Sequence, residues 1–84
     1  MKKSSSLDWL GRRLIQYKMP EKATKILAVN AQLFPMEARV HSYLAYAYYL
    51  AKNSTQMKAA VQTALQLDKS DTLALELQRL VNKL

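Results

Sequence analysis

The pattern that decides the fold of this chain is Leu10-Gly11-x-x-Leu14, followed by Ala23-x-x-x-Leu27 and then by Pro35. A weaker copy begins about 34 residues later with Leu44-Ala45-x-x-Tyr48, followed by Met57-x-x-x-Val61-x-x-Ala64-Leu65. In each copy small residues stand where two helices must approach closely, and larger apolar residues stand one helical turn away. A period of this length predicts a repeat of two helices joined by a tight turn, which buries its apolar face only by stacking on a neighbour.

The composition limits the chain to one small helical domain. The 84 residues leave room for a single domain, which we place at residues 1–84. One Gly and two Pro stand against abundant Ala, Leu, Lys and Gln, and half of the residues are hydrophobic, so we expect a folded, all-α chain. A chain this short buries only about 60% of the surface that its unfolded form exposes, so its stability should be small.

Helical periodicity and capping residues predict about five helices. Ser6 is a good N-cap for the first helix, Pro20 and Pro35 suit the starts of the second and third, and Asn53 or Ser54 suits the start of the fourth. The expected helices cover residues 7–17, 20–33, 36–51, 55–67 and 72–84. Because the connections are short, neighbouring helices should be antiparallel. They form two hairpin units, at about 7–35 and 38–68, and a C-terminal capping helix at 72–84.

The expected C-terminal helix carries apolar residues in nearly every direction around its axis. They are Leu73, Leu75, Leu77, Leu80, Val81 and Leu84. A helix that is apolar all round is expected to be buried, so some of these side chains should require a surface from another chain. The alternative is an ordinary C-terminus with a few exposed leucines.

Residues from both copies resemble the tetratricopeptide repeat (TPR) family. The resemblance covers about residues 7–69 and is carried by Leu10-Gly11, Ala23, Leu27, Pro35 and the ending Ala64-Leu65-x-Leu67-Asp68. It implies a TPR-like right-handed stack of helix hairpins that recognises other proteins. One subgroup of the family grips acidic C-terminal peptides with Lys and Asn at the fifth and ninth repeat positions. The resemblance does not imply that clamp here, because those positions hold Asp8, Arg12, Ser42 and Tyr46.

In this family, set positions on the first helix of each unit line a concave surface. Carried onto this sequence and onto its C-terminal helix, the resemblance implies partner-binding residues at Arg12, Ile15, Arg39, Tyr46, Tyr49, Leu50, Leu73 and Leu80. Tyrosine suits such a surface, because it offers a large apolar area with few rotatable bonds. An apolar groove with a basic rim would hold an amphipathic helix with acidic flanks. The alternative is that Tyr46 and Tyr49 fill the core between helices, as Tyr48 is expected to do in either case.

A narrower resemblance is to the small TPR-like chaperones of bacterial type III secretion, including those that hold the needle subunit. It lies in the size of the chain and in the stretch from Glu21-Lys22-Ala23-Thr24-Lys25-Ile26-Leu27 to Leu33-Phe34-Pro35. This likeness implies a chaperone or adaptor that wraps the amphipathic helix of a polymerising export substrate, usually together with a second small helical protein. We therefore expect a protein-binding chaperone that works in a hetero-complex.

The side chains available argue against catalysis and against cofactors. There is no Cys and only one histidine, His41, so a thiolate site, a cysteine nucleophile or a histidine-based metal site lacks its ligands. His41 should make a local hydrogen bond, with Glu37 one helical turn away as the expected partner. No nucleophile–base pair, glycine-rich phosphate loop or carboxylate dyad emerges, so we expect no enzyme, no cofactor and no metal.

Hydropathy and net charge set the expected surroundings of the protein. The longest apolar run, at residues 44–51, is far too short to span a bilayer, and no signal-peptide run follows the charged start, so we expect a soluble, cytoplasmic protein. The net charge is +7, with Lys18, Lys22 and Lys25 on one helix face. Three interpretations of that face are open: it is simply solvated, it attracts an acidic partner, or it binds nucleic acid. Two alternatives to the chaperone thus remain, a scaffold that self-associates through its C-terminal helix and a basic nucleic-acid-binding protein.

Overall fold

The computed structural model describes residue 13 and residues 15–83. Within this part the chain is all-helical, as expected, and contains no strand. Its four helices are α2 (Pro20–Leu33), α3 (Ala38–Leu50), α4 (Ser54–Leu67) and α5 (Thr72–Asn82).

The first expected helix, at residues 7–17, lies almost wholly outside the described residues. The described residues at its end, Arg13, Ile15 and Gln16, are helical. The backbone N–H of Tyr17 donates to the carbonyl oxygen of Arg13 at 2.9 Å, which is the spacing of an α-helical turn. The described chain therefore has four helices rather than about five, with one helical turn ahead of α2.

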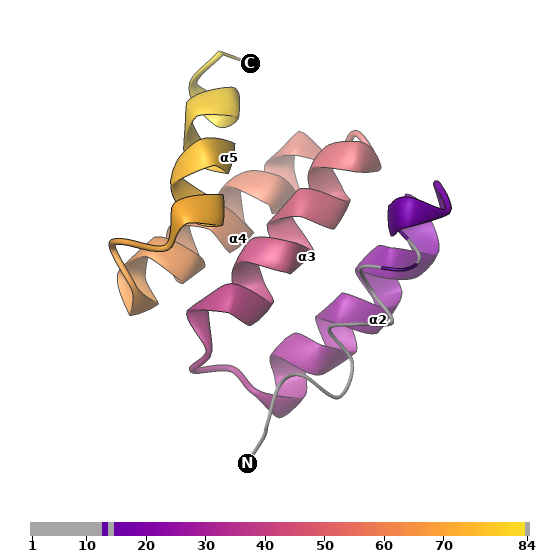
Figure 1. The fold of residues 1–84 in the computed structure, drawn as a ribbon, viewed down its shortest axis with the longest axis horizontal. Helices are drawn as coiled ribbons and strands as arrows, with labels where there is room; N and C mark the ends of the chain where they lie inside the picture. The colour runs from indigo at the N-terminus through magenta and orange to yellow at the C-terminus, as the bar shows by residue number, and fades with distance from the viewer. Residues whose placement is uncertain (1–12, 14, 84) are drawn as a thin grey trace.

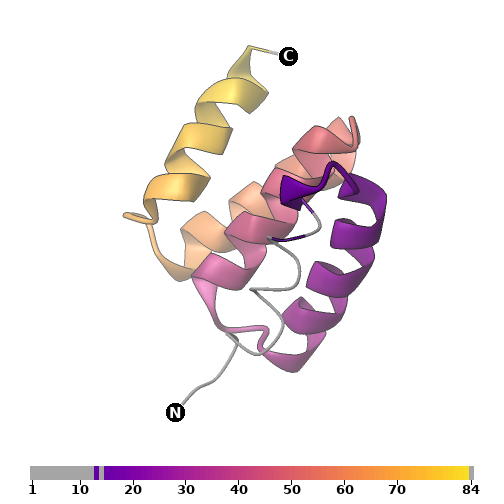
Figure 2. The same cartoon turned by 45° about the vertical axis from the view of Figure 1, so that its right-hand side comes forward.

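Successive helices run in opposite directions, and α4 lies behind α3 in the view of Figure 1. Helix α2 packs against α3, α3 packs against α4, and α5 packs against both α3 and α4. Both views place α3 between α2 and α5 (Figures 1 and 2). The connections contain only three or four residues, so each helix folds back antiparallel to its predecessor.

The backbone repeats with the period that the sequence predicts. Helix α4, at residues 54–67, begins and ends one full period after α2, at residues 20–33. The turns match too: the N–H of Lys18 donates to the carbonyl of Ile15 at 3.0 Å, and the N–H of Lys52 donates to the carbonyl of Tyr49 at 3.1 Å. Lys18 and Lys52 also share a left-handed backbone, with φ of 62° and 63°. The same local geometry therefore introduces α2 and α4.

Local capping explains where three of the helices begin. At α4, the Asn53 side chain accepts a hydrogen bond from the N–H of Gln56 at 3.2 Å, as the sequence predicts. At α5, the Asp71 side chain accepts from the N–H of Ala74 at 3.0 Å. At α2, Pro20 takes the first helical position, where its missing N–H would have had no helical partner.

Helix α3 begins later than the sequence predicts. Pro35 is expected to open a helix at residues 36–51, whereas α3 begins at Ala38 with Glu37 as its N-cap. The reason lies in the preceding turn. There the N–H of Phe34 bonds the carbonyl of Asn30 at 2.9 Å, and the N–H of Glu37 bonds the carbonyl of Phe34 at 3.2 Å. Closing this turn uses residues 34–37, so the helix starts only after them.

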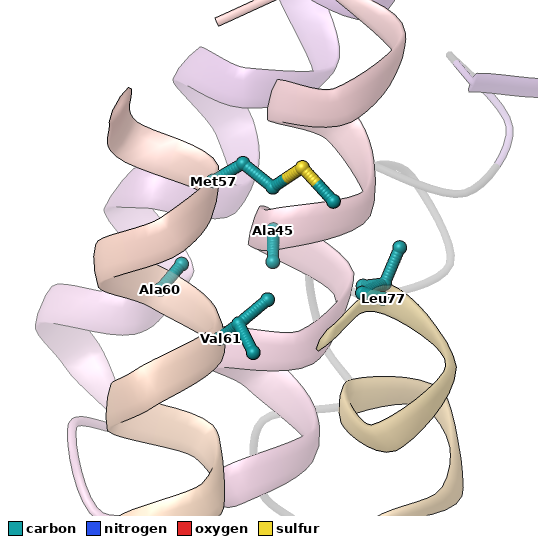
Figure 3. Packing of buried hydrophobic residues seen from close by; sticks show 5 residues of the cluster. All are labelled: Ala45, Met57, Ala60, Val61 and Leu77. Atoms are coloured by element: carbon teal, nitrogen blue, oxygen red, sulfur yellow. The ribbon is translucent and has the colours of Figure 1, made fainter. Parts of the chain in front are cut away.

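Two clusters of buried side chains hold the helices together. The first comes from α3, α4 and α5, whose side chains point into one space (Figure 3), and contains Ala45, Met57, Ala60, Val61 and Leu77. The second lies between α2 and α3 and contains Ala23, Leu27, Leu44 and Ala47. Tyr48 packs against both clusters and joins them, in agreement with its expected place in the core.

Helix α5 is amphipathic, so the expectation that it is apolar on all sides is wrong. Leu77 is buried, and Leu73, Leu80 and Val81 are partly buried against the first cluster. At 3.6 residues per turn, these four positions fall within about 100° of the helix circumference. Leu75 alone among the described leucines of α5 is exposed, at 40%, and the expected sixth apolar residue, at position 84, lies outside the described residues.

Candidate functional site

A surface cavity of about 990 Å³ lies between the segment that leads into α2 and one side of α3. Its described apolar and aromatic lining consists of Ile15, Pro20, Tyr43, Tyr46 and Leu50, and its polar lining of Arg13, Gln16 and Lys18. Three of these residues are spaced i, i+3 and i+7 along α3, so they face the same side of that helix. We call this space the first cavity.

Three of the residues predicted to bind a partner meet in the first cavity, namely Ile15, Tyr46 and Leu50. Sequence reasoning missed Tyr43 as a partner-binding residue, although its spacing from Tyr46 and Leu50 on one helix face could have revealed it. It also missed Arg13 and Lys18, the cationic lining residues that precede α2. Repeat positions defined on helices do not point to a turn residue such as Lys18.

A second cavity, of about 420 Å³, shares Leu50 with the first. Its described lining consists of Tyr49, Leu50, Lys52, Ser54 and Met57, from the end of α3 and the start of α4. The turn ahead of α2 and the turn between α3 and α4 lie at the same end of the helix stack, at the upper right of Figure 1. The two cavities therefore follow one edge of the stack.

The predicted tyrosines divide between the cavities and the core. Tyr46 belongs to both, because it lines the first cavity and also packs against the first cluster. Tyr49 lines the second cavity, is 36% exposed and belongs to neither cluster. Of the two, Tyr49 is the one that can be replaced without removing core contacts.

Arg39 forms an ion pair that holds two helices together. Its Nε lies 3.2 Å from Oδ2 of Asp71, which is only 3% exposed and also caps α5. Two hydrogen bonds raise the pKa of Arg39 above its ordinary value. The bond to Asp71 has the larger effect and the bond to Tyr43 the next. The guanidinium thus links α3 to the start of α5, and Arg39 lines neither cavity.

Two further predicted residues, Leu73 and Leu80, line neither cavity. Leu73 and Leu80 pack against the first cluster, where they hold α5 on the stack. Arg12 lies outside the described residues, and its neighbour Arg13 lines the first cavity.

Every described charged residue that lines either cavity is cationic. Arg13 and Lys18 line the first cavity and Lys52 lines the second, while no Asp or Glu occurs among the described lining residues. An anionic group would therefore meet no repulsion from these walls, whereas a cationic group would.

The other polar groups of interest have local roles. His41 Nε2 lies 2.9 Å from the carbonyl oxygen of Pro35, so its partner is this carbonyl and not Glu37. Among residues 13 and 15–83, no three His, Asp or Glu side chains gather where they could hold a metal ion. A search of the same residues for a helix with the length and hydropathy to cross a bilayer finds none.

Comparison with known proteins does not assign a family. No protein-family model matches the chain, and searches of curated proteins and of solved structures give no significant match. The two cavities, their cationic lining and the hairpin repeat are therefore the features of this chain that bear on its function.

Proposed function

We propose that this protein is a chaperone or adaptor that holds an apolar, amphipathic helix of a partner protein along the two cavities. The observation that supports this most is the meeting of Ile15, Tyr46 and Leu50 with cationic residues around one space of about 990 Å³. An apolar floor with a basic rim suits a helix that has an apolar face and acidic flanks.

The size of this surface favours a polypeptide over a small ligand. Pockets for small molecules span about 300–1,000 Å³. The first cavity alone, at about 990 Å³, reaches the top of that range, and the second adds about 420 Å³ along the same edge. The tyrosines supply rigid contact area at a small entropic cost, which is how many protein-binding surfaces gain affinity.

We further propose that the hairpins stack as they do in tetratricopeptide repeats. The shared period of the helices and the turns supports this arrangement. The resemblance to needle-subunit chaperones then supplies the class of partner, a small export substrate whose amphipathic helix would otherwise polymerise. In that setting the protein works in the cytoplasm, in a complex with its substrate and a second small helical protein.

The test measures binding of a labelled synthetic amphipathic helix by fluorescence anisotropy. Because Tyr49 lies outside both core clusters, Tyr49→Ala should weaken binding by about 1–4 kcal/mol and leave the melting temperature unchanged. The matched control is Tyr17→Ala, which removes the same side chain from a site that is 65% exposed and lines neither cavity. Tyr46→Ala should reduce affinity and stability together. Wild-type protein that binds no apolar helix, or equal binding by all three variants, would refute the proposal.

One observation favours a second candidate, self-association through α2. Val29 and Leu33 on α2 and Met36 in the next turn are exposed large apolar residues. Helix α5 offers no comparable surface, because Leu77 is part of the core. A dimer in sedimentation that dissociates on Leu33→Lys would support this candidate, whereas Leu77→Lys would unfold the domain.

A further inference from the structure

Two lysines occupy equivalent positions with unfavourable backbone geometry. Lys18 and Lys52 are the only non-glycine residues with positive φ in the part of the chain that the structure describes, and they stand one repeat period apart. Lys52 follows the C-cap of α3, and its N–H bonds the carbonyl of Tyr49 at 3.1 Å while the N–H of Asn53 bonds that of Tyr48 at 2.9 Å. This pair of bonds is the Schellman motif, in which glycine usually takes the left-handed position.

Lysine at this position costs conformational energy that glycine would not, because the Cβ crowds the backbone in the left-handed region. Backbone outliers of this kind persist where the surrounding structure over-determines them, and they cluster at functional sites such as ligand clamps. Here each lysine lines a cavity, Lys18 the first and Lys52 the second. What lysine provides and glycine lacks is a long side chain with a positive charge at its end.

We propose that Lys18 and Lys52 are repeat-equivalent binding residues that select a partner helix carrying carboxylates beside its apolar face. The inference rests on the proposed function and specifies the partner's charge and the residues that read it. Since the two turns share one geometry and line adjoining cavities, they offer two positive charges at successive points along the same edge of the stack.

Charge complementarity on this edge argues for such an occupant. The described lining residues include three cations and no carboxylate, and the whole chain has a net charge of +7. The apolar lining favours a polypeptide over nucleic acid, because a phosphate backbone offers no apolar face to contact Ile15 and Leu50. An acidic, amphipathic helix satisfies both parts of the surface.

The experiment compares three synthetic helices that share one apolar face and carry Glu, Gln or Lys on the polar face. At low salt, wild-type protein should bind the Glu peptide most tightly and the Lys peptide least. Lys18→Gly and Lys52→Gly should each weaken binding of the Glu peptide about two- to five-fold and leave the Gln peptide unaffected. Both variants should melt at a higher temperature than wild type, so lost binding cannot be blamed on unfolding.

The control is Lys58→Gln, which removes one charge from an exposed site on α4 that lines neither cavity and should leave all three affinities unchanged. If the glycine variants bind the Glu peptide as wild type does, the lysines have no binding role, although capture of an apolar helix still stands. If no peptide binds, the proposed function fails as well. If a single-stranded oligonucleotide binds more tightly than the Glu peptide, with the steeper salt dependence, nucleic acid is the partner and the inference is overturned.

Discussion

Replacing Asp71 should loosen α5 from the rest of the stack. Its carboxylate has two contacts that no other described side chain duplicates. Oδ1 accepts a hydrogen bond from the N–H of Ala74 at 3.0 Å and so caps α5, while Oδ2 lies 3.2 Å from Nε of Arg39 on α3. One buried side chain therefore fixes both the start of α5 and its position on α3.

The expected loss follows from these two contacts. Removing an N-cap side chain costs about 1 kcal/mol. The ion pair contributes less than about 1 kcal/mol, because the Arg39 side chain is 53% exposed and water screens it. Asp71→Ala should therefore lower the free energy of unfolding by about 1.5–2 kcal/mol and the melting temperature by about 6–16 °C. Asp71→Asn keeps a capping oxygen and loses the charge, so it should cost only about 0.5 kcal/mol.

Urea unfolding followed by circular dichroism measures these differences, and a cycle with Arg39→Gln isolates the pair. The coupling free energy between the two positions should be about 0.5 kcal/mol. Equal damage from the Asn and Ala variants would refute the capping argument. If Arg39→Gln leaves stability unchanged and weakens binding of the acidic peptide, Arg39 belongs to the binding rim that the sequence resemblance implies.

Three further outcomes follow from the described contacts. Leu77→Ala should destabilise the protein by about 2–5 kcal/mol in urea unfolding, because Leu77 is buried where α3, α4 and α5 meet. Lys52→Gly should raise the free energy of unfolding by about 1 kcal/mol by removing left-handed strain, whereas Lys58→Gly within α4 should lower it by a similar amount. The Ser70 hydroxyl and N–H donate to Asp68 at 2.8 and 3.0 Å and lower its pKa, so Ser70→Ala should raise that pKa towards 3.8 in an NMR titration. The stability that Asp68 contributes is complete above about pH 3.8 and is lost as the pH falls through the lower folded-state pKa.

The helices were predictable wherever a local signal sets the boundary. Proline at the first position starts α2 where the sequence predicts it, and the Asn53 cap places the start of α4 within one residue. The start of α3 was not predictable in this way, since Pro35 lies inside a turn closed by backbone hydrogen bonds to Asn30 and Phe34. Backbone hydrogen bonds of this kind do not depend on particular side chains, so the residue types do not predict them.

The error on α5 has a different origin. The expectation places apolar residues in nearly every direction around the helix axis, whereas the described apolar positions other than Leu75 fall on one face. The sequence contained the answer here. Counting at 3.6 residues per turn would have predicted an amphipathic helix with its apolar face on the stack.

Repeat positions taken from the resemblance include Ile15, Tyr46 and Leu50, which line one cavity in the structure. That these residues bind a partner stays a prediction. The pairing of Arg39 with Asp71 spans 32 residues and depends on how α5 crosses α3, which no local pattern encodes. The left-handed backbone of Lys18 and Lys52 was also not predictable, because glycine, not lysine, is the usual residue at such a position.

The repeat also indicates which end of the stack is closed to a partner helix. On α3, Ser42 and Ala45 are buried, and Ala45 packs with residues of α4 and α5. The equivalent positions on α5, one repeat later, hold Glu76 and Arg79, which are exposed and whose Oε2 and Nη1 lie 3.6 Å apart. A helix placed on α5 as α4 is placed on α3 would have to desolvate this pair, and the Coulomb attraction between the two charges rarely offsets that cost. An incoming helix should therefore avoid this face of α5 and bind along the edge that carries Lys18 and Lys52.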